Sequence, residues 1–172
     1  MSKKDYFSHT CLIFVALLFA FVATGLNPLF YWLWYTPVDT LAFSQIMQFL
    51  LHGSSLGASF MPNEIAHMVD VRRVMIAFLL AGCAAVGWLL AIDAIPRASL
   101  KKVALGYLIG LPFFPVLFYV FHFIFFPQGN WQFPRSSMLI QLFPFYFFFV
   151  CTAAILLVSL GFLWTVNKLN KA

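Results

Sequence analysis

The chain has 172 residues, of which 63% are hydrophobic, 20% aromatic and only 9% charged. Soluble domains carry roughly a quarter charged residues, so this chain lacks the polar side chains that would cover a surface in water. A soluble globular protein is excluded, and a membrane protein is predicted. Because one helical crossing takes about 20 apolar residues, the length allows about four spans in a single membrane domain.

The first apolar stretch runs from about residue 11 to residue 35 and follows Lys3 and Lys4. A cleaved signal peptide would have an apolar region of about 7–15 residues. This stretch is longer and ends in a cluster of Tyr and Trp side chains at 31–35, which suits the membrane interface. We therefore expect a retained membrane span.

The connection after this span, residues 36–70, contains a segment in which apolar side chains recur at helical spacing between polar ones. The apolar positions are Phe43, Ile46, Met47 and Leu50, and Gly53 supplies a stop signal. The pattern predicts a short amphipathic helix on the membrane surface. A loop segment packed against the helix bundle is the alternative.

Three further spans follow, at about 71–95, 103–126 and 139–166. The second contains several small residues, among them Gly82, which permit close helix contact. In the third, Pro112 and Pro115 each remove a backbone donor and should bend its outer half. The expected fold is all-α, with four transmembrane helices.

Four spans place both termini on one side of the membrane, and the basic residues predict which side. Seven Lys and Arg lie at the termini and in the link between the second and third spans, against three in or beside the loops 36–70 and 127–138. Cytoplasmic segments carry the excess of Lys and Arg. Both termini should therefore be cytoplasmic, with the two longer loops outside. Basic residues this scattered indicate topology, and no nucleic-acid partner is expected.

A dense group of ionisable side chains stands at the outer start of the second span. Glu64, His67 and Asp70 follow one another at intervals of three residues, so a helix presents them on one face. A carboxylate beside an imidazole can fix its tautomer, whereas the structural alternative is a helix start with acids near its positive end. The segment ends on Arg72 and Arg73, whose simplest role is to reach lipid headgroups.

His122 lies five residues before Pro127, roughly 7–8 Å below the outer end of the third span. An ionisable side chain at membrane depth is a candidate for a functional site. The direction of the third span brings it toward the same membrane face as His67. A histidine satisfied by a neighbouring carbonyl is the structural alternative.

Three stretches occur in order along the chain: Glu64-x-x-His67-Met68-x-Asp70-Val71, then Phe121-His122-x-x-Phe125-Phe126-x-x-Gly129-Asn130-Trp131-x-Phe133, then Leu139-Ile140-x-Leu142-Phe143-Pro144. Together they resemble the lipoprotein intramolecular transacylase (Lit) family, over most of spans two to four. The resemblance implies a four-span protein of the bacterial cytoplasmic membrane. By the distribution of Lys and Arg, its active site is expected toward the extracytoplasmic face.

The activity implied by this resemblance is an intramolecular acyl transfer. The substrate would be a diacylglyceryl-cysteine lipoprotein in membrane lipid, whose sn-2 acyl chain moves to the α-amino group of the N-terminal cysteine to give a lyso-form lipoprotein. The two functional histidines of the family would correspond to His67 and His122. No cofactor is expected.

The residues suit such a reaction on physical grounds. Donor ester and acceptor amine belong to one molecule, so holding them in reacting geometry can replace an activated enzyme nucleophile. His67 and His122 can divide the roles of general base and general acid, in either order. Glu64 or Asp70 would orient His67. The side chains expected to stabilise the oxyanion or hold a headgroup are Arg72, Arg73, Asn130 and Trp131.

Two other classes of function remain open from the sequence. One histidine on each of two spans is the minimum for a bis-histidine haem, and the pair His67-Met68 with the remaining methionines could bind a soft metal. Six Met in so apolar a chain are also explained as packing residues. A non-enzymatic membrane subunit is the third possibility.

Overall fold

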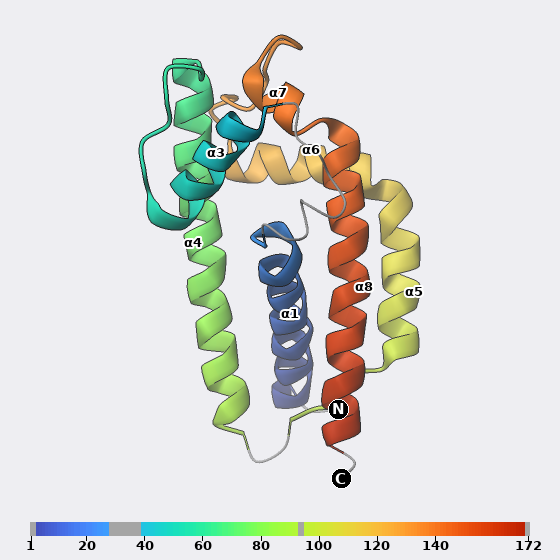
Figure 1. Cartoon of the computed structure of the whole chain (residues 1–172). Coiled ribbons are helices and arrows are strands. Elements are labelled where there is room, and N and C mark those ends of the chain that lie inside the picture. The colour runs from blue at the N-terminus through green and yellow to red at the C-terminus, as the bar shows by residue number, and fades with distance from the viewer. Residues whose placement is uncertain (1–2, 28–38, 93–94, 171–172) are drawn as a thin grey trace. The chain divides into compact units, whose positions relative to one another are not determined.

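The structure is a computed structural model, and it describes residues 3–27, 39–92 and 95–170. Its elements are all helical, which confirms the predicted fold class (Figure 1). In chain order they are α1 (Lys3–Gly25), α3 (Thr40–His52), α4 (Pro62–Leu90), α5 (Leu100–Gly110), the 3-10 helix η1 (Leu111–Phe113), α6 (Phe114–Phe125), α7 (Met138–Leu142) and α8 (Phe145–Leu169).

Four helical segments in the described residues are long and apolar enough to cross a membrane: Lys4–Gly25, Pro62–Leu90, Leu100–Phe125 and Phe145–Leu169. Their outward side chains are apolar as well, with Leu90 77% exposed and Leu108 70% exposed. Large apolar side chains in such number on a surface mark contact with lipid. The protein is a multi-pass membrane protein, as its composition predicts.

The bounds of these helices differ from the predicted ones at three places. α4 begins at Pro62 and ends at Leu90, whereas the predicted span is 71–95, so residues 62–70 of the predicted outer loop are helical. Proline is well suited to the first position of a helix. α1 ends at Gly25, and the Tyr and Trp cluster at 31–35 lies outside the described residues. The predicted span 139–166 is divided into α7 and α8 by Phe143 and Pro144. Proline restricts the residue before it to extended backbone, and Phe143 has left the helical region with φ −128° and ψ 68°.

The third membrane segment is interrupted where the prolines predict. α5 ends at Gly110, and the three residues of η1 separate it from α6. Pro112 falls within η1, while Pro115 lies in the first turn of α6, where a missing N–H leaves no hydrogen bond unmade. Neither α5 nor α6 alone has the roughly 20 residues of a full crossing.

The chain forms two compact units. The first is drawn from the described residues of 1–25, 77–113 and 151–172, and the second from those of 26–76 and 114–150. α4 and α8 each contribute residues to both units. The prediction of one membrane domain with cytoplasmic termini stays a prediction.

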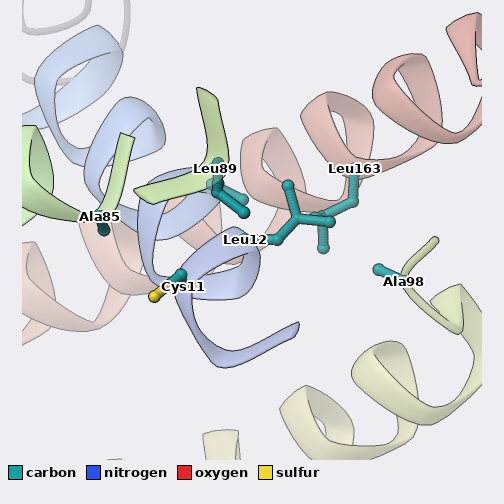
Figure 2. Packing of buried hydrophobic residues seen from close by; sticks show 7 residues of the cluster. Cys11, Leu12, Ala85, Leu89, Ala98 and Leu163 are labelled. Atoms are coloured by element: carbon teal, nitrogen blue, oxygen red, sulfur yellow. The ribbon is translucent and has the colours of Figure 1, made fainter. Parts of the chain in front are cut away.

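The core of the first unit is apolar and built largely from small side chains and leucines. Figure 2 shows Leu12 of α1 directed toward Leu163 of α8, with Leu89 of α4 beside them. Leu12 is 2% exposed, and Ala16, one turn further along α1, is fully buried. At Gly82 of α4 an added Cβ would collide with a Leu18 methyl group of α1. The prediction of close helix contact is therefore confirmed at Gly82, whereas at Gly87 of the same span an added Cβ would meet open space.

Polar links at the helix ends add to this packing. The indole N–H of Trp88 donates to Ser8 Oγ at 3.1 Å. Near the end of α8, Asn167 pairs with the backbone of Ala98, accepting from its N–H at 2.9 Å and donating to its carbonyl at 2.7 Å. These bonds tie the segment before α5 to α8 through groups that the bilayer interior would leave unpaired.

In the second unit, α3 forms where the apolar periodicity predicts a helix. Asp39 caps its start by accepting from the Ala42 N–H at 2.9 Å, and Gly53 ends it in the left-handed region at φ 74°. The apolar face of α3 is buried, with Ile46 1% exposed, and Phe43 packs on Phe143 at a centroid distance of 5.8 Å. This face therefore contacts protein, and a place on the membrane surface stays a prediction.

Candidate functional site

The site residues predicted from sequence lie in the second unit, on the first turns of α4, on α6 and on the loop between α6 and α7. α6 runs across the start of α4 (Figure 1), and so carries His122 to the place where His67 stands. His67 is 8% exposed, and Glu64, one turn before it, is fully buried.

The two imidazoles come together as the sequence predicts. The ring centroids of His67 and His122 are 6.1 Å apart, and the ring planes differ by 23°. Phe126 packs against both, at 4.7 Å from His67 and 5.4 Å from His122. Phe133 covers His67 at 5.5 Å, and Trp131 covers His122 at 4.9 Å. The pair therefore stands in an aromatic enclosure that limits the access of water.

The hydrogen bond of His122 defines which ring nitrogen is free. Its Nδ1 lies 2.7 Å from the carbonyl oxygen of Phe118, one turn earlier on α6. A carbonyl oxygen only accepts, so Nδ1 carries the proton and Nε2 of the neutral ring is left as an acceptor. The structural alternative for His122 was a ring whose hydrogen bond is made with a neighbouring carbonyl. This describes Nδ1 correctly, but it leaves Nε2 available to accept a proton.

Glu64 does not orient His67, which corrects one expectation from the sequence. One carboxylate oxygen accepts from Ser137 Oγ at 2.5 Å and from the Leu139 N–H at 3.0 Å, and the other accepts from the Met61 N–H at 2.6 Å. Ser137 is also the N-cap of α7. The buried carboxylate therefore holds the start of α7 against the start of α4.

Asp70 holds a different part of the same loop. Its Oδ2 accepts from Gln128 Nε2 at 2.7 Å and from Asn130 Nδ2 at 2.9 Å, while Oδ1 pairs with Arg73 at 3.0 Å. Gln128 and Asn130 lie 58 and 60 residues after Asp70 in the sequence. Asp70 and Glu64 thus anchor the α6–α7 loop at two points, one on each side of Phe133, which covers His67.

Two buried polar atoms in this site form no hydrogen bond within the described residues: Nδ1 of His67 and Oδ1 of Asn130. The Asn130 side chain is nevertheless close enough to interact with the His67 imidazole. One is a nitrogen that can carry a proton and the other an oxygen that accepts one. They are complementary.

Arg72 and Arg73, which were expected to stabilise an oxyanion or hold a headgroup, both interact with other residues of the protein. Arg72 donates through Nε to the Leu50 carbonyl at 3.3 Å, and its guanidinium lies beside Gly53 at the end of α3. A cation at this place compensates the negative end of the α3 dipole. Arg73 pairs with Asp70, but its side chain is 75% exposed.

Sequence reasoning missed four residues of the site: Phe126 and Phe133, which pack on His67, and Gln128 and Ser137, which bind the two carboxylates. Ser137 carried a signal, because a serine before an apolar run is typical of a helix N-cap. Phe126 and Phe133 stand in the second of the three motifs, where no role was given to them, and Gln128 carried no signal.

The bis-histidine haem alternative does not fit this arrangement. A porphyrin between the rings would extend sideways from the midpoint between them, and Phe126 stands at that place in contact with both rings. In the described parts of the chain, no group of three or more His, Cys, Asp or Glu side chains could hold a metal ion.

Comparison with known proteins gives a match at the level of structure. No family model and no curated protein sequence matches the chain. The in meso structure of the membrane integral lipoprotein intramolecular transacylase Lit from Bacillus cereus matches it with a TM-score of 0.75 and 18% sequence identity, over 98% of this chain and 93% of that one. The chain has the fold of this transacylase. The fold implied by the three sequence motifs is therefore confirmed.

Proposed function

We propose that the protein is an acyltransferase of the bacterial cytoplasmic membrane. It moves the sn-2 acyl chain of a diacylglyceryl-cysteine lipoprotein to the α-amino group of the same cysteine, and the product is a lyso-form lipoprotein. The observation that carries the proposal is the pair of imidazoles, with centroids 6.1 Å apart, inside an enclosure of aromatic rings. The likeness in fold to Lit from Bacillus cereus supports it.

The reaction needs positioning more than an activated nucleophile. The amine and the ester belong to one substrate molecule, and oriented intramolecular reactions reach effective concentrations of about 10⁵–10⁸ M. The enzyme then has two tasks, which are to move a proton and to stabilise the oxyanion. Two neutral imidazoles suit the first, because such a ring can accept a proton at one nitrogen while the other stays protonated, and can then deliver a proton.

The hydrogen bond of His122 supports a role for this residue as the general base. Its Nε2 is a free acceptor, so His122 takes the proton as the amine nitrogen attacks the ester carbonyl carbon. The proton then passes from His122 to Nε2 of the neighbouring His67, and the resulting imidazolium delivers it to the sn-2 oxygen as the carbon–oxygen bond breaks. The amine loses one proton and the glyceryl oxygen gains one. Both imidazoles are then neutral again, as at the start.

The surrounding side chains have supporting roles. Phe126 and Trp131 keep water from the ester, which would otherwise be hydrolysed. Glu64 holds the loop that carries Trp131, and Arg73 is exposed enough to meet a lipid headgroup. By the distribution of Lys and Arg, the site faces the extracytoplasmic side, where the lipid-modified cysteine lies.

The test is to express the protein in cells whose lipoproteins are diacylated and to analyse the N-terminal peptides by mass spectrometry. The expected product carries one amide-linked and one ester-linked chain on the cysteine. His67→Ala and His122→Ala should each lower its formation by about 10²–10⁴-fold, the usual contribution of a general acid or base. His52→Ala is the matched control, because His52 is exposed at the end of α3.

Two outcomes would contradict the proposal. The first is near-normal product from both histidine variants. The second is the absence of the lyso-form with the unmodified protein present in the membrane, which would favour a non-enzymatic membrane subunit.

A further inference from the structure

The side-chain amide of Asn130 is held at one end. Its Nδ2 donates to Asp70 Oδ2 at 2.9 Å, across 60 residues of sequence. An amide group is planar, with its oxygen and nitrogen on opposite branches, so fixing the nitrogen also fixes the direction of the oxygen. Asp70 in turn is held in place by Gln128 and Arg73.

The free end of that amide belongs to the same site as an atom with the opposite requirement. Oδ1 of Asn130 and Nδ1 of His67 are both buried and lack hydrogen bonds in the described residues, and the two side chains are within interaction range. A buried polar atom left unpaired costs about 1–3 kcal/mol. A hydrogen bond between these two atoms would remove both costs at once.

We infer that Asp70 and Asn130 form a positioning pair for His67, in which the carboxylate orients the amide and the amide oxygen accepts the Nδ1–H of the imidazole. The pair fixes the tautomer of His67 and leaves Nε2 to face the substrate. Both imidazoles of the site then have the same arrangement, with Nδ1–H donated to a carbonyl-type oxygen and Nε2 free.

This differs from the role expected for these residues from the sequence. Asn130 was expected to donate to an oxyanion, but its amide nitrogen already donates to Asp70. Asp70 was expected to orient His67 directly, but both of its oxygens are engaged by other side chains, and it acts through Asn130. The consequence for catalysis rests on the proposed transacylase function, whereas the tautomer of His67 is a property of the protein alone.

The chain provides a matched control for a merely structural role. Gln128 donates to the same Asp70 oxygen, at 2.7 Å, from the same loop. Removing Gln128 therefore weakens the anchoring of the loop, while leaving Asn130 in place beside His67. If the amides only anchor the loop, Gln128→Ala and Asn130→Ala will behave alike.

The tautomer is measured by solid-state NMR of the full-length protein in lipid bilayers, with ¹⁵N-labelled histidine. The chain has only four histidines, so His→Ala variants assign the signals. In the unmodified protein and in Gln128→Ala, neutral His67 should carry its proton on Nδ1. In Asn130→Ala this preference should be lost, while the His122 signal, fixed by the Phe118 carbonyl, stays unchanged and reports an intact fold.

Kinetics on a synthetic diacylglyceryl lipopeptide provide the second measurement. Asn130→Ala should lower kcat by about 10–100-fold, typical of a residue that orients a functional imidazole, with KM within about threefold. Asp70→Asn should follow Asn130→Ala, and Gln128→Ala should lose markedly less activity than either.

Each result has a defined meaning for the inference. A proton on Nε2 of His67 in the unmodified protein, a tautomer unchanged in Asn130→Ala, or equal kinetic losses in Asn130→Ala and Gln128→Ala would each overturn it. If the expected tautomers are found but the protein has no transacylase activity, the proposed function fails and the positioning pair stands.

Discussion

Different kinds of interaction stabilise the interior of each of the two compact units. The first unit relies on close apolar packing of Leu12, Leu89 and Leu163, with a few polar bonds near the helix ends. In the second unit, two carboxylates on α4, Glu64 and Asp70, bind donors from a distant loop. The first arrangement tolerates small shifts, whereas the second determines the position of individual atoms.

The difference follows from the solvent and from the task. In lipid, apolar side chains gain little from leaving the solvent, so helices associate by close packing and by satisfying polar groups. A bundle that only has to remain associated needs no more than that. The loop beside His67 has to hold aromatic and amide groups in fixed positions, and charge-assisted hydrogen bonds supply that precision because they are strong and directional.

The largest expected effect is the loss of the buried Glu64 carboxylate. Glu64→Ala leaves the donors of Met61, Ser137 and Leu139 without an acceptor and should lower the free energy of unfolding by about 3 kcal/mol. Transfer activity should be lost as well, because the α6–α7 loop is no longer anchored. Unfolding in mixed micelles and the lipopeptide assay measure the two effects.

Asp39→Ala is the matched control for this variant. Asp39 also accepts from a backbone N–H at a helix start in the second unit, but only from one. Its loss should cost about 1 kcal/mol, the usual value for an N-cap. Equal losses of stability in Glu64→Ala and Asp39→Ala would show that the Glu64 network contributes no more than a single cap.

An intermediate effect is expected at the polar link of the first unit. Asn167→Ala removes both hydrogen bonds to the Ala98 backbone and should lower the free energy of unfolding by about 2 kcal/mol. The rate of transfer per folded molecule should not change, because Asn167 belongs to the unit that holds neither histidine. A lowered kcat in fully folded Asn167→Ala would show that the contrast between the units is incorrect.

The smallest effect concerns helix packing in the first unit. An added Cβ at Gly82 meets the Leu18 side chain, whose flexible end can move aside, whereas an added Cβ at Gly87 meets open space. Both substitutions by Ala improve helix propensity, so Gly82→Ala should be less stable than Gly87→Ala by about 1 kcal/mol. Thermal unfolding in detergent compares them, and a Gly82→Ala protein as stable as Gly87→Ala would show that α1 and α4 are packed less closely there.

Local features of the site could be predicted where the cause is local. Gly53 ends α3, and the prolines at 112 and 115 flank the break between α5 and α6, because backbone sterics act within a few residues. The approach of His67 and His122 followed from the direction of two spans. The partners of Glu64 could not be predicted, since they lie 73 and 75 residues further along the chain.

The amino-acid sequence by itself determined that the chain is helical, that it resides in lipid and which two imidazoles belong together, because apolar composition and helical spacing act through the solvent and the backbone. Only the tertiary structure decided what each carboxylate does. Asp70 and Glu64 have the same local pattern beside His67, and their roles differ because different donors of the α6–α7 loop reach them. A hydrogen bond is formed with the atom that arrives within about 3 Å, and folding alone brings that atom there.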